Sequence, residues 1–133
     1  MAHGKKTFSD RGREEELREL LHRRLLVLDG AMGTMLQALD LKAADFGGAA
    51  LEGCNENLVL TRGDSIREVH EAYFKAGSDM VETNTFGANR LHLKDYGCEN
   101  ETAAINYQGA KLAREVAGAK AWVNVCARRG CGR

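Results

Sequence analysis

The sequence contains no proline, no long apolar segment and no excess of charge of either sign. Average usage would give about seven prolines, so their absence from 133 residues is unusual for a complete natural domain. The 19 basic and 19 acidic residues balance to a formal net charge of zero. This balance excludes the basic surface that is typical of proteins that bind nucleic acid or an acidic membrane.

No apolar run approaches the roughly 20 residues that span a bilayer. Near the N-terminus, Lys5 and Lys6 are not followed by an apolar core, so the sequence predicts no secretory signal either. With 44% hydrophobic and 29% charged residues, the chain has the composition of one small globular domain. We therefore expect a cytoplasmic protein that contacts neither nucleic acid nor membrane.

Four cysteines are present, Cys54, Cys98, Cys126 and Cys131. Without a secretory signal, they are expected to be free thiols in a reducing compartment. Structural zinc favours close cysteine pairs that together supply four ligands. Cys126 and Cys131 have no second pair, so we interpret all four cysteines as ordinary thiols. A small thiol or metal protein built on Cys126 and Cys131 is the alternative.

Apolar stripes and short apolar runs predict alternating helices and strands. A capping-box pattern, Ser65-Ile-Arg-Glu68, begins the clearest helix, and Gly77 is suited to end it. Strands that alternate with helices indicate a parallel α/β fold. The predicted helices are 13–24, 34–41, 65–76, 88–96 and 100–116, the predicted strands are Leu25–Leu28, Asp79–Thr83 and Ala121–Val125, and residues 42–60 are expected to be irregular.

Asp29 follows the first predicted strand and begins a turn that contains Gly30, Ala31 and Gly33. The glycines let the backbone approach a small ligand closely. A carboxylate beside backbone N–H groups could bind the ammonium and carboxylate groups of an amino acid. The alternative is structural, with Asp29 capping the next helix. The glycine spacing does not match the dinucleotide-binding fingerprint.

Polar residues also crowd the end of the second predicted strand. Alternation would place Glu82 and Asn84 on one face and Thr83 and Thr85 on the other. These residues could line a ligand site, because active sites of α/β barrels lie at the carboxyl ends of the strands. A hydrogen-bonded structural role is equally open, and Phe86 is interpreted from the pattern alone as a packing residue.

The histidines show no ligand pattern. His70 lies on the inward stripe of its predicted helix and is interpreted as a packed or capping residue. His22 and His92 fall on other helices, and no catalytic Ser–His–Asp or Cys–His arrangement stands out.

Two segments, Leu26–Leu36 and Asp79–Asn89, resemble the homocysteine S-methyltransferase domain. The resemblance covers about residues 15–125 and is nearest to the N-terminal module of cobalamin-dependent methionine synthases. It implies an α/β fold made of the first three βα units of a (β/α)8 TIM barrel, which is incomplete here. Supporting residues between and after the two segments are Ala44-Asp45-Phe46, Asn55–Leu60, Ile66, His70, Tyr73, Ala76-Gly77 and Ala104–Asn106.

The resemblance implies transfer of a methyl group to the homocysteine thiolate, giving methionine. In that family, zinc held by three cysteine thiolates lowers the pKa of the homocysteine thiol, and methylcobalamin is the donor in the methionine synthases. The amino-acid end of homocysteine would lie at Asp29 and at the backbone of Gly30, Ala31 and Met32. The mouth of the pocket would be lined by Asn84, Thr85 and Phe86.

A complete barrel of this type needs eight strands and about 250 residues. The family's zinc cysteines lie on late strands, and none of the four cysteines here matches a ligand position. We therefore expect no catalytic residue, zinc or cobalamin on this chain, and no activity in isolation. The expected partners are homocysteine, the missing C-terminal barrel half, and cobalamin and folate modules.

The resemblance also divides the chain. Residues 1–12 are expected to form a disordered tail, residues 13–125 a partial homocysteine-binding barrel domain, and residues 126–133 an atypical tail that suggests truncation or a frameshift. The alternative function is a non-catalytic interaction module, or decoy, that pairs with a complementary half-barrel.

Overall fold

The computed structural model describes residues 8–119 and 121–126 as a mixed α/β fold, mostly helical, with a small parallel sheet. No helix within these ranges is long and apolar enough to cross a membrane. The helices are α1 (Phe8–Arg23), α2 (Met32–Gln37), α3 (Ala43–Phe46), α4 (Leu58–Thr61), α5 (Gly63–Ala76), α6 (Arg90–Lys94) and α7 (Thr102–Ala117). The strands are β1 (Met80–Glu82) and β2 (Trp122–Asn124), and the short 3-10 helices are η1 (Ala49–Leu51), η2 (Asn55–Asn57) and η3 (Glu99–Glu101).

Strand β1 is the centre of the sheet. It pairs in parallel with β2, with Val81 opposite Val123, and Met80 also makes a parallel bridge to Leu28. Each of these segments is separated from the next by at least one helix, as parallel strands require. The α/β alternation predicted from the sequence is therefore confirmed.

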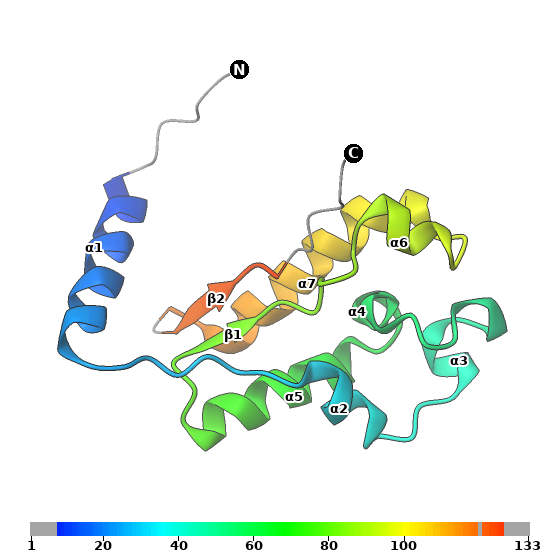
Figure 1. The fold of residues 1–133 in the computed structure, drawn as a ribbon, viewed down its shortest axis with the longest axis horizontal. Coiled ribbons are helices and arrows are strands. Elements are labelled where there is room, and N and C mark those ends of the chain that lie inside the picture. Colours follow the sequence, from blue (N-terminus) through cyan, green and yellow to red (C-terminus); the bar gives the residue numbers. More distant parts are fainter. Residues whose placement is uncertain (1–7, 120, 127–133) are drawn as a thin grey trace.

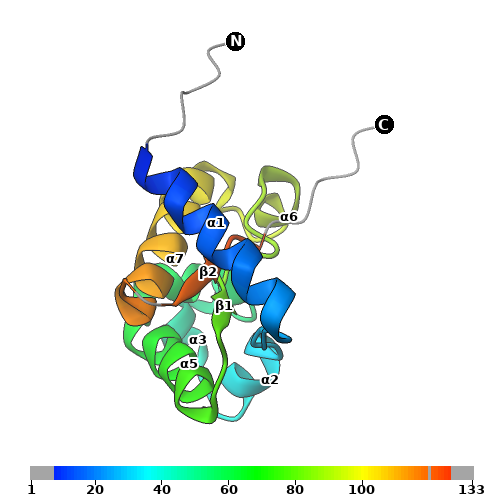
Figure 2. The same ribbon diagram turned by 90° about the vertical axis from the view of Figure 1, so that its left-hand side faces the viewer.

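Helices α5 and α7 pack against each other and against one face of the sheet (Figures 1 and 2). Their inward stripes provide much of the core, since Ile66, Ile105 and Leu112 have at most 1% of their surface exposed. Gly77 ends α5 with a φ of 107°, a left-handed conformation that suits glycine. The sheet is thereby held against a helical core.

The predicted first strand, Leu25–Leu28, is wrong in its extent and its burial. It forms only the single bridge from Leu28, and the exposed fractions of Leu25 and Val27 are 92% and 54%. The segment still runs beside β1, because Asp79 N–H donates to the Val27 carbonyl at 2.8 Å. A parallel strand is buried on both faces only where helices cover both faces of the sheet, and the described helices leave Leu25 and Val27 exposed, so the apolar composition does not produce a buried strand here.

Helix α1 begins at Phe8, so residues 8–12 of the predicted tail lie in a helix, and residues 1–7 lie outside the described residues. One glycine, Gly12, costs a helix only about 1 kcal/mol. Figure 1 shows α1 set to one side of the remaining helices. Its contact with the sheet includes Arg13, whose guanidinium lies 4.6 Å from the ring centre of Trp122.

The expectation of irregular structure over residues 42–60 is also wrong, because α3, η1, η2 and the start of α4 lie there. A buried hydrogen bond of 2.7 Å from Asn57 Nδ2 to the Phe46 carbonyl joins η2 to the end of α3. Contacts of this kind cross eleven residues and leave no periodic trace in the sequence. The capping-box prediction fails as well, since α5 begins at Gly63 and Ser65 is buried within it.

A carboxylate at the start of β1 ties the segment before Leu28 to the sheet. Asp79 accepts two hydrogen bonds from Arg24, at 2.9 and 2.6 Å, and one from Val27 N–H at 2.8 Å. The Arg24 guanidinium, followed by the Val27 N–H, lowers the pKa of the Asp79 carboxyl to about 2. The ionised form is therefore favoured in the folded state.

We expect Asp79→Asn to lower the melting temperature by about 5 °C at pH 7, because the amide cannot replace the charge-assisted bonds. The pKa of Asp79 in the folded chain is below its unfolded value near 4. The stability that the ionised carboxylate contributes is therefore complete above pH 4 and is lost as the pH falls towards 2. Thermal melts of both chains from pH 7 to pH 2 should converge at the acid end. Curves that stay parallel would contradict the assignment.

Candidate functional site

A pocket of about 160 Å³ lies at the carboxyl ends of the parallel segments. It brings together six of the seven residues that the sequence predicted for substrate binding, from two stretches about 50 positions apart. Glu82, Thr83 and Cys126 complete the lining. The six predicted residues are Asp29, Gly30, Ala31, Met32, Asn84 and Phe86.

Asp29 is the charged group on one wall of this pocket. Its Oδ1 accepts a hydrogen bond of 2.8 Å from Glu82 N–H, which fixes the carboxylate against β1. Burial raises the pKa of the Asp29 carboxyl, the Glu82 N–H opposes the rise, and the nearby Glu82 carboxylate adds to it. Two carboxylates that share a partly enclosed site favour a cationic ligand group between or beside them.

The turn after Asp29 is strained. Ala31 has a φ of 42° and a ψ of 36°, the left-handed region that costs a residue with a side chain about 1–2 kcal/mol. It precedes α2, which has no side-chain cap. The alternative in which Asp29 caps this helix is therefore wrong, since the Asp29 carboxylate bonds to Glu82 instead. Backbone strain of this kind is a recurrent feature of ligand sites.

Asn84 makes a structural hydrogen bond and also forms part of the pocket wall. Its Nδ2 donates to the Asn55 carbonyl at 2.8 Å, which is structural, and the residue also lines the pocket. Phe86 lies at the rim with 58% of its surface exposed. Its interpretation as a packing residue does not fit this exposure.

Thr85 does not line the pocket. Its hydroxyl donates to the Cys126 carbonyl at 2.5 Å, and the Cys126 N–H donates to Thr83 Oγ1 at 3.0 Å. The two threonine hydroxyls are 2.6 Å apart. The Thr85 hydroxyl has one proton, which it donates to the Cys126 carbonyl. The Thr83 hydroxyl must therefore be the donor in its hydrogen bond to the Thr85 hydroxyl. This ring of hydrogen bonds joins the ends of β1 and β2 behind the pocket wall.

Cys126 is the pocket residue that sequence reasoning missed. Burial, followed by the charge of Glu82, raises the pKa of its thiol. The signal for it was its place directly after the third predicted strand, as Asp29 follows the first. Cys54 and Cys98 are buried elsewhere, with burial raising the pKa of the Cys54 thiol to about 11, and Cys131 lies outside the described residues.

Metal ligands do not gather in the described part of the chain, which holds no group of three or more His, Cys, Asp or Glu side chains placed for an ion. Of the three cysteines in the described ranges, Cys126 alone lines the pocket described above. A zinc site of the kind that the resemblance implies therefore does not fit the residues described here.

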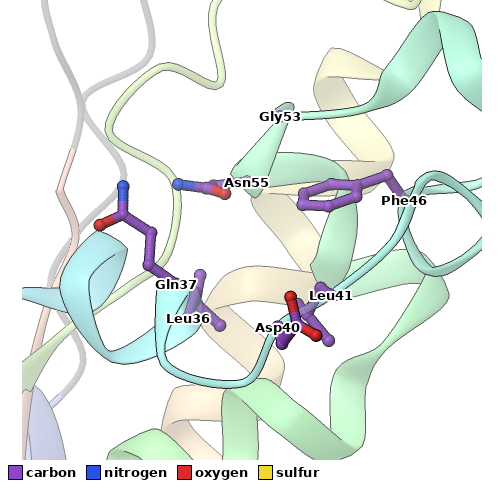
Figure 3. A pocket seen from close by; sticks show the side chains of 7 residues that line it. All are labelled: Leu36, Gln37, Asp40, Leu41, Phe46, Gly53 and Asn55. Atoms are coloured by element: carbon purple, nitrogen blue, oxygen red, sulfur yellow. The ribbon is translucent and has the colours of Figure 1, made fainter.

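A second pocket, of about 280 Å³, lies between α2 and α3 (Figure 3). Its one carboxylate, Asp40, is already paired with Lys42 at 2.6 Å. None of the seven predicted site residues lines it. Size alone does not make it the better candidate, because it presents no free charge to a ligand. Its lining residues are Leu36, Gln37, Asp40, Leu41, Phe46, Gly53 and Asn55.

The chain is thus a mixed α/β domain with a small acidic pocket at the carboxyl ends of parallel strands, which is where open α/β folds commonly bind their ligands. The particular family follows from comparison with known proteins. Residues 26–132 match the family model described as homocysteine S-methyltransferase, and the chain belongs to this family. The resemblance drawn from the two motifs is confirmed.

Relatives in two mycobacteria are similar over much of the chain but are far longer. The methionine synthase of Mycobacterium tuberculosis is 48% identical over 104 residues, which are 78% of this chain and 9% of that protein. The methionine synthase of Mycobacterium leprae is 47% identical over 104 residues, with 78% and 8% covered. The chain thus spans less than a tenth of the curated relatives it matches.

Solved structures of the homocysteine methyltransferase MmuM from Escherichia coli share the fold. The metallated form gives a TM-score of 0.59 at 29% identity, and the oxidized form gives 0.60 at 30%. Each comparison covers 75% of this chain and 33% of the solved one. The similarity therefore extends over a third of a larger fold.

Proposed function

We propose that this chain is the N-terminal part of a homocysteine S-methyltransferase barrel of the methionine synthase type. It would supply the first βα units and the site for the amino-acid end of homocysteine. The observation that carries the proposal is the pocket in which Asp29, the strained turn at Ala31 and the rim residues Asn84 and Phe86 meet. Asp29 would bind the substrate ammonium, and the backbone of residues 30–32 would face its carboxylate.

The methyl transfer itself requires groups that this chain does not bring together. Because the described residues form no zinc site, we assign the zinc, the cobalamin and their ligands to the remainder of the longer proteins. The isolated chain is then a cytoplasmic, inactive part of the enzyme that retains a substrate pocket. Thr85 supports that pocket from behind through the Cys126 carbonyl.

Binding of L-homocysteine to the 15N-labelled chain under reducing conditions tests the proposal. We expect amide shifts at residues 29–32 and 82–86, and we expect Asp29→Asn to raise the dissociation constant at least tenfold, which corresponds to about 1.4 kcal/mol for a lost ion pair. Binding should also weaken as the pH falls towards the raised pKa of the Asp29 carboxyl. Protonation removes the charge that attracts the ammonium.

Asp40→Asn is the matched control, because it changes the carboxylate of the second pocket and leaves the first intact. Its affinity for L-homocysteine should equal that of the wild type. Equal weakening by both substitutions, or shifts centred on α2 and α3, would place the ligand in the wrong pocket and contradict the proposal.

A second function, pairing with a complementary half-barrel, is favoured by the exposed apolar residues beside the sheet. Leu28 and Val125 are 41% and 62% exposed, in addition to Leu25 and Val27. Unpaired sheet edges with apolar side chains are surfaces that another segment can cover. Co-expression with the remaining strands should give one stable complex by size-exclusion chromatography if this is the function, and two separate species if it is not.

A further inference from the structure

The loop from Asn84 to Asn89, which joins β1 to α6, carries the rim of the pocket (Figure 1). It is attached at two points to η2, which contributes no residue to that pocket. Asn84 Nδ2 donates to the Asn55 carbonyl at 2.8 Å, and Gly87 N–H donates to Glu56 Oε1 at 2.8 Å. The two attachments lie on either side of Phe86.

Glu56 is placed unusually for a carboxylate. Only 8% of its surface is exposed, and burying a charge is costly unless it is paired or hydrogen-bonded. One carboxylate oxygen takes the Gly87 N–H, and the other lies 3.8 Å from Nε2 of His92. A hydrogen bond to an ionised acceptor is about twice as strong as a neutral one, so this attachment is a strong one.

The fit around Gly87 is tight. A Cβ at this position would lie 2.5 Å from Glu56 Oε1 and 2.5 Å from Cδ2 of His92. The loop backbone thus approaches the carboxylate as closely as a residue without a side chain allows. On the other side of the loop, Asn106 Nδ2 of α7 donates to the Ala88 carbonyl at 2.7 Å. The backbone after Phe86 has little freedom to move.

Packing does not fix the Phe86 ring, which is 58% exposed, so its place at the rim depends on the backbone on either side. We propose that Glu56 is a positioning residue, which acts through Gly87 to hold Phe86 against the substrate in the pocket. This inference rests on the proposed function, because the substrate is homocysteine in that pocket. Glu56 itself does not touch the ligand.

The test compares Glu56→Met, which keeps the volume but removes the acceptor, with Glu56→Gln, whose side-chain carbonyl can still accept from Gly87. We expect Glu56→Met to move the Gly87 amide proton upfield and to raise the dissociation constant of L-homocysteine roughly fivefold or more, as expected for a lost charge-assisted bond. Glu56→Gln should restore the Gly87 shift and most of the affinity.

Asn57→Ala is the matched control: it removes a buried polar group of the same helix whose bond goes to Phe46 and not to the rim. It should destabilise the chain without changing the Gly87 shift or the affinity. Equal loss of affinity in Asn57→Ala, or no difference between the two Glu56 variants, would overturn the proposal. If the wild type does not bind L-homocysteine, the proposed function fails, while the Gly87 shift still decides whether Glu56 holds the rim.

Discussion

Acidification from pH 7.5 to pH 4 is expected to remove about 3 kcal/mol of folding free energy through one side chain, His70. This histidine is 0% exposed, and neither ring nitrogen has a hydrogen-bond partner among the described residues. Burial lowers the pKa of the imidazole to about 4, because the charged form cannot be solvated there.

The sign follows from the two states of the chain. In the unfolded chain the imidazole has its ordinary pKa near 6.5, so protonation favours unfolding once the pH is below that value. The contribution of the neutral histidine is complete above pH 6.5 and is lost as the pH falls to about 4. The loss of stability that we expect from protonation of Asp79 begins only below about pH 4. The effects of His70 and Asp79 on stability can therefore be separated by pH.

Urea unfolding at several pH values measures this effect. We expect His70→Leu, which has a similar volume and no polar atom, to lose far less stability between pH 7.5 and pH 4. It should match or exceed the wild type at pH 7.5, since two buried nitrogen atoms without partners are removed. His22→Gln is the control because His22 is exposed on α1, and it should keep the wild-type pH dependence. Equal pH dependence in His70→Leu and the wild type would contradict the assignment.

Local sequence patterns correctly predicted the elements whose conformation follows from their own residues. Helices α5 and α7 follow from their apolar stripes, and the parallel order follows from the alternation with strands. The Leu25–Leu28 strand could not be predicted correctly, because its burial depends on helices that cover the faces of the sheet, and the described helices leave Leu25 and Val27 exposed. The helices between 42 and 60 depend on distant contacts, such as that of Asn57 with Phe46.

For the candidate site, the strand pattern placed Asp29 and Asn84 at the carboxyl ends of parallel strands, where the active sites of α/β barrels lie, and the family resemblance added Phe86. The placement of Thr85 at the mouth of the pocket came from the family resemblance and not from the strand pattern. Alternation puts Thr83 and Thr85 on one face, opposite Glu82 and Asn84, and the 2.6 Å between the two threonine hydroxyls agrees with it. Thr85 stays out of the pocket lining because its hydroxyl bonds to the Cys126 carbonyl behind the wall.

The position of Thr85 also leaves no room for a side chain at Gly109 on α7. A Cβ at Gly109 would lie 2.5 Å from Cγ2 of Thr85. The threonine cannot simply rotate away, because its hydroxyl is held by the Cys126 carbonyl and by Thr83. The close approach of α7 to the end of β1 therefore depends on the absence of a side chain at this one position.

We expect Gly109→Ala to cost about 1–3 kcal/mol of stability through overpacking, although glycine-to-alanine changes inside helices usually stabilise by up to about 1 kcal/mol. Gly12→Ala in α1 is the control, since nothing lies within 4 Å of its added Cβ, and it should stabilise the chain. Thr85→Ser keeps the hydroxyl and removes the methyl group, so it should rescue Gly109→Ala in a double-mutant cycle. Additive effects in urea unfolding would mean that α7 and the end of β1 do not meet at these two residues.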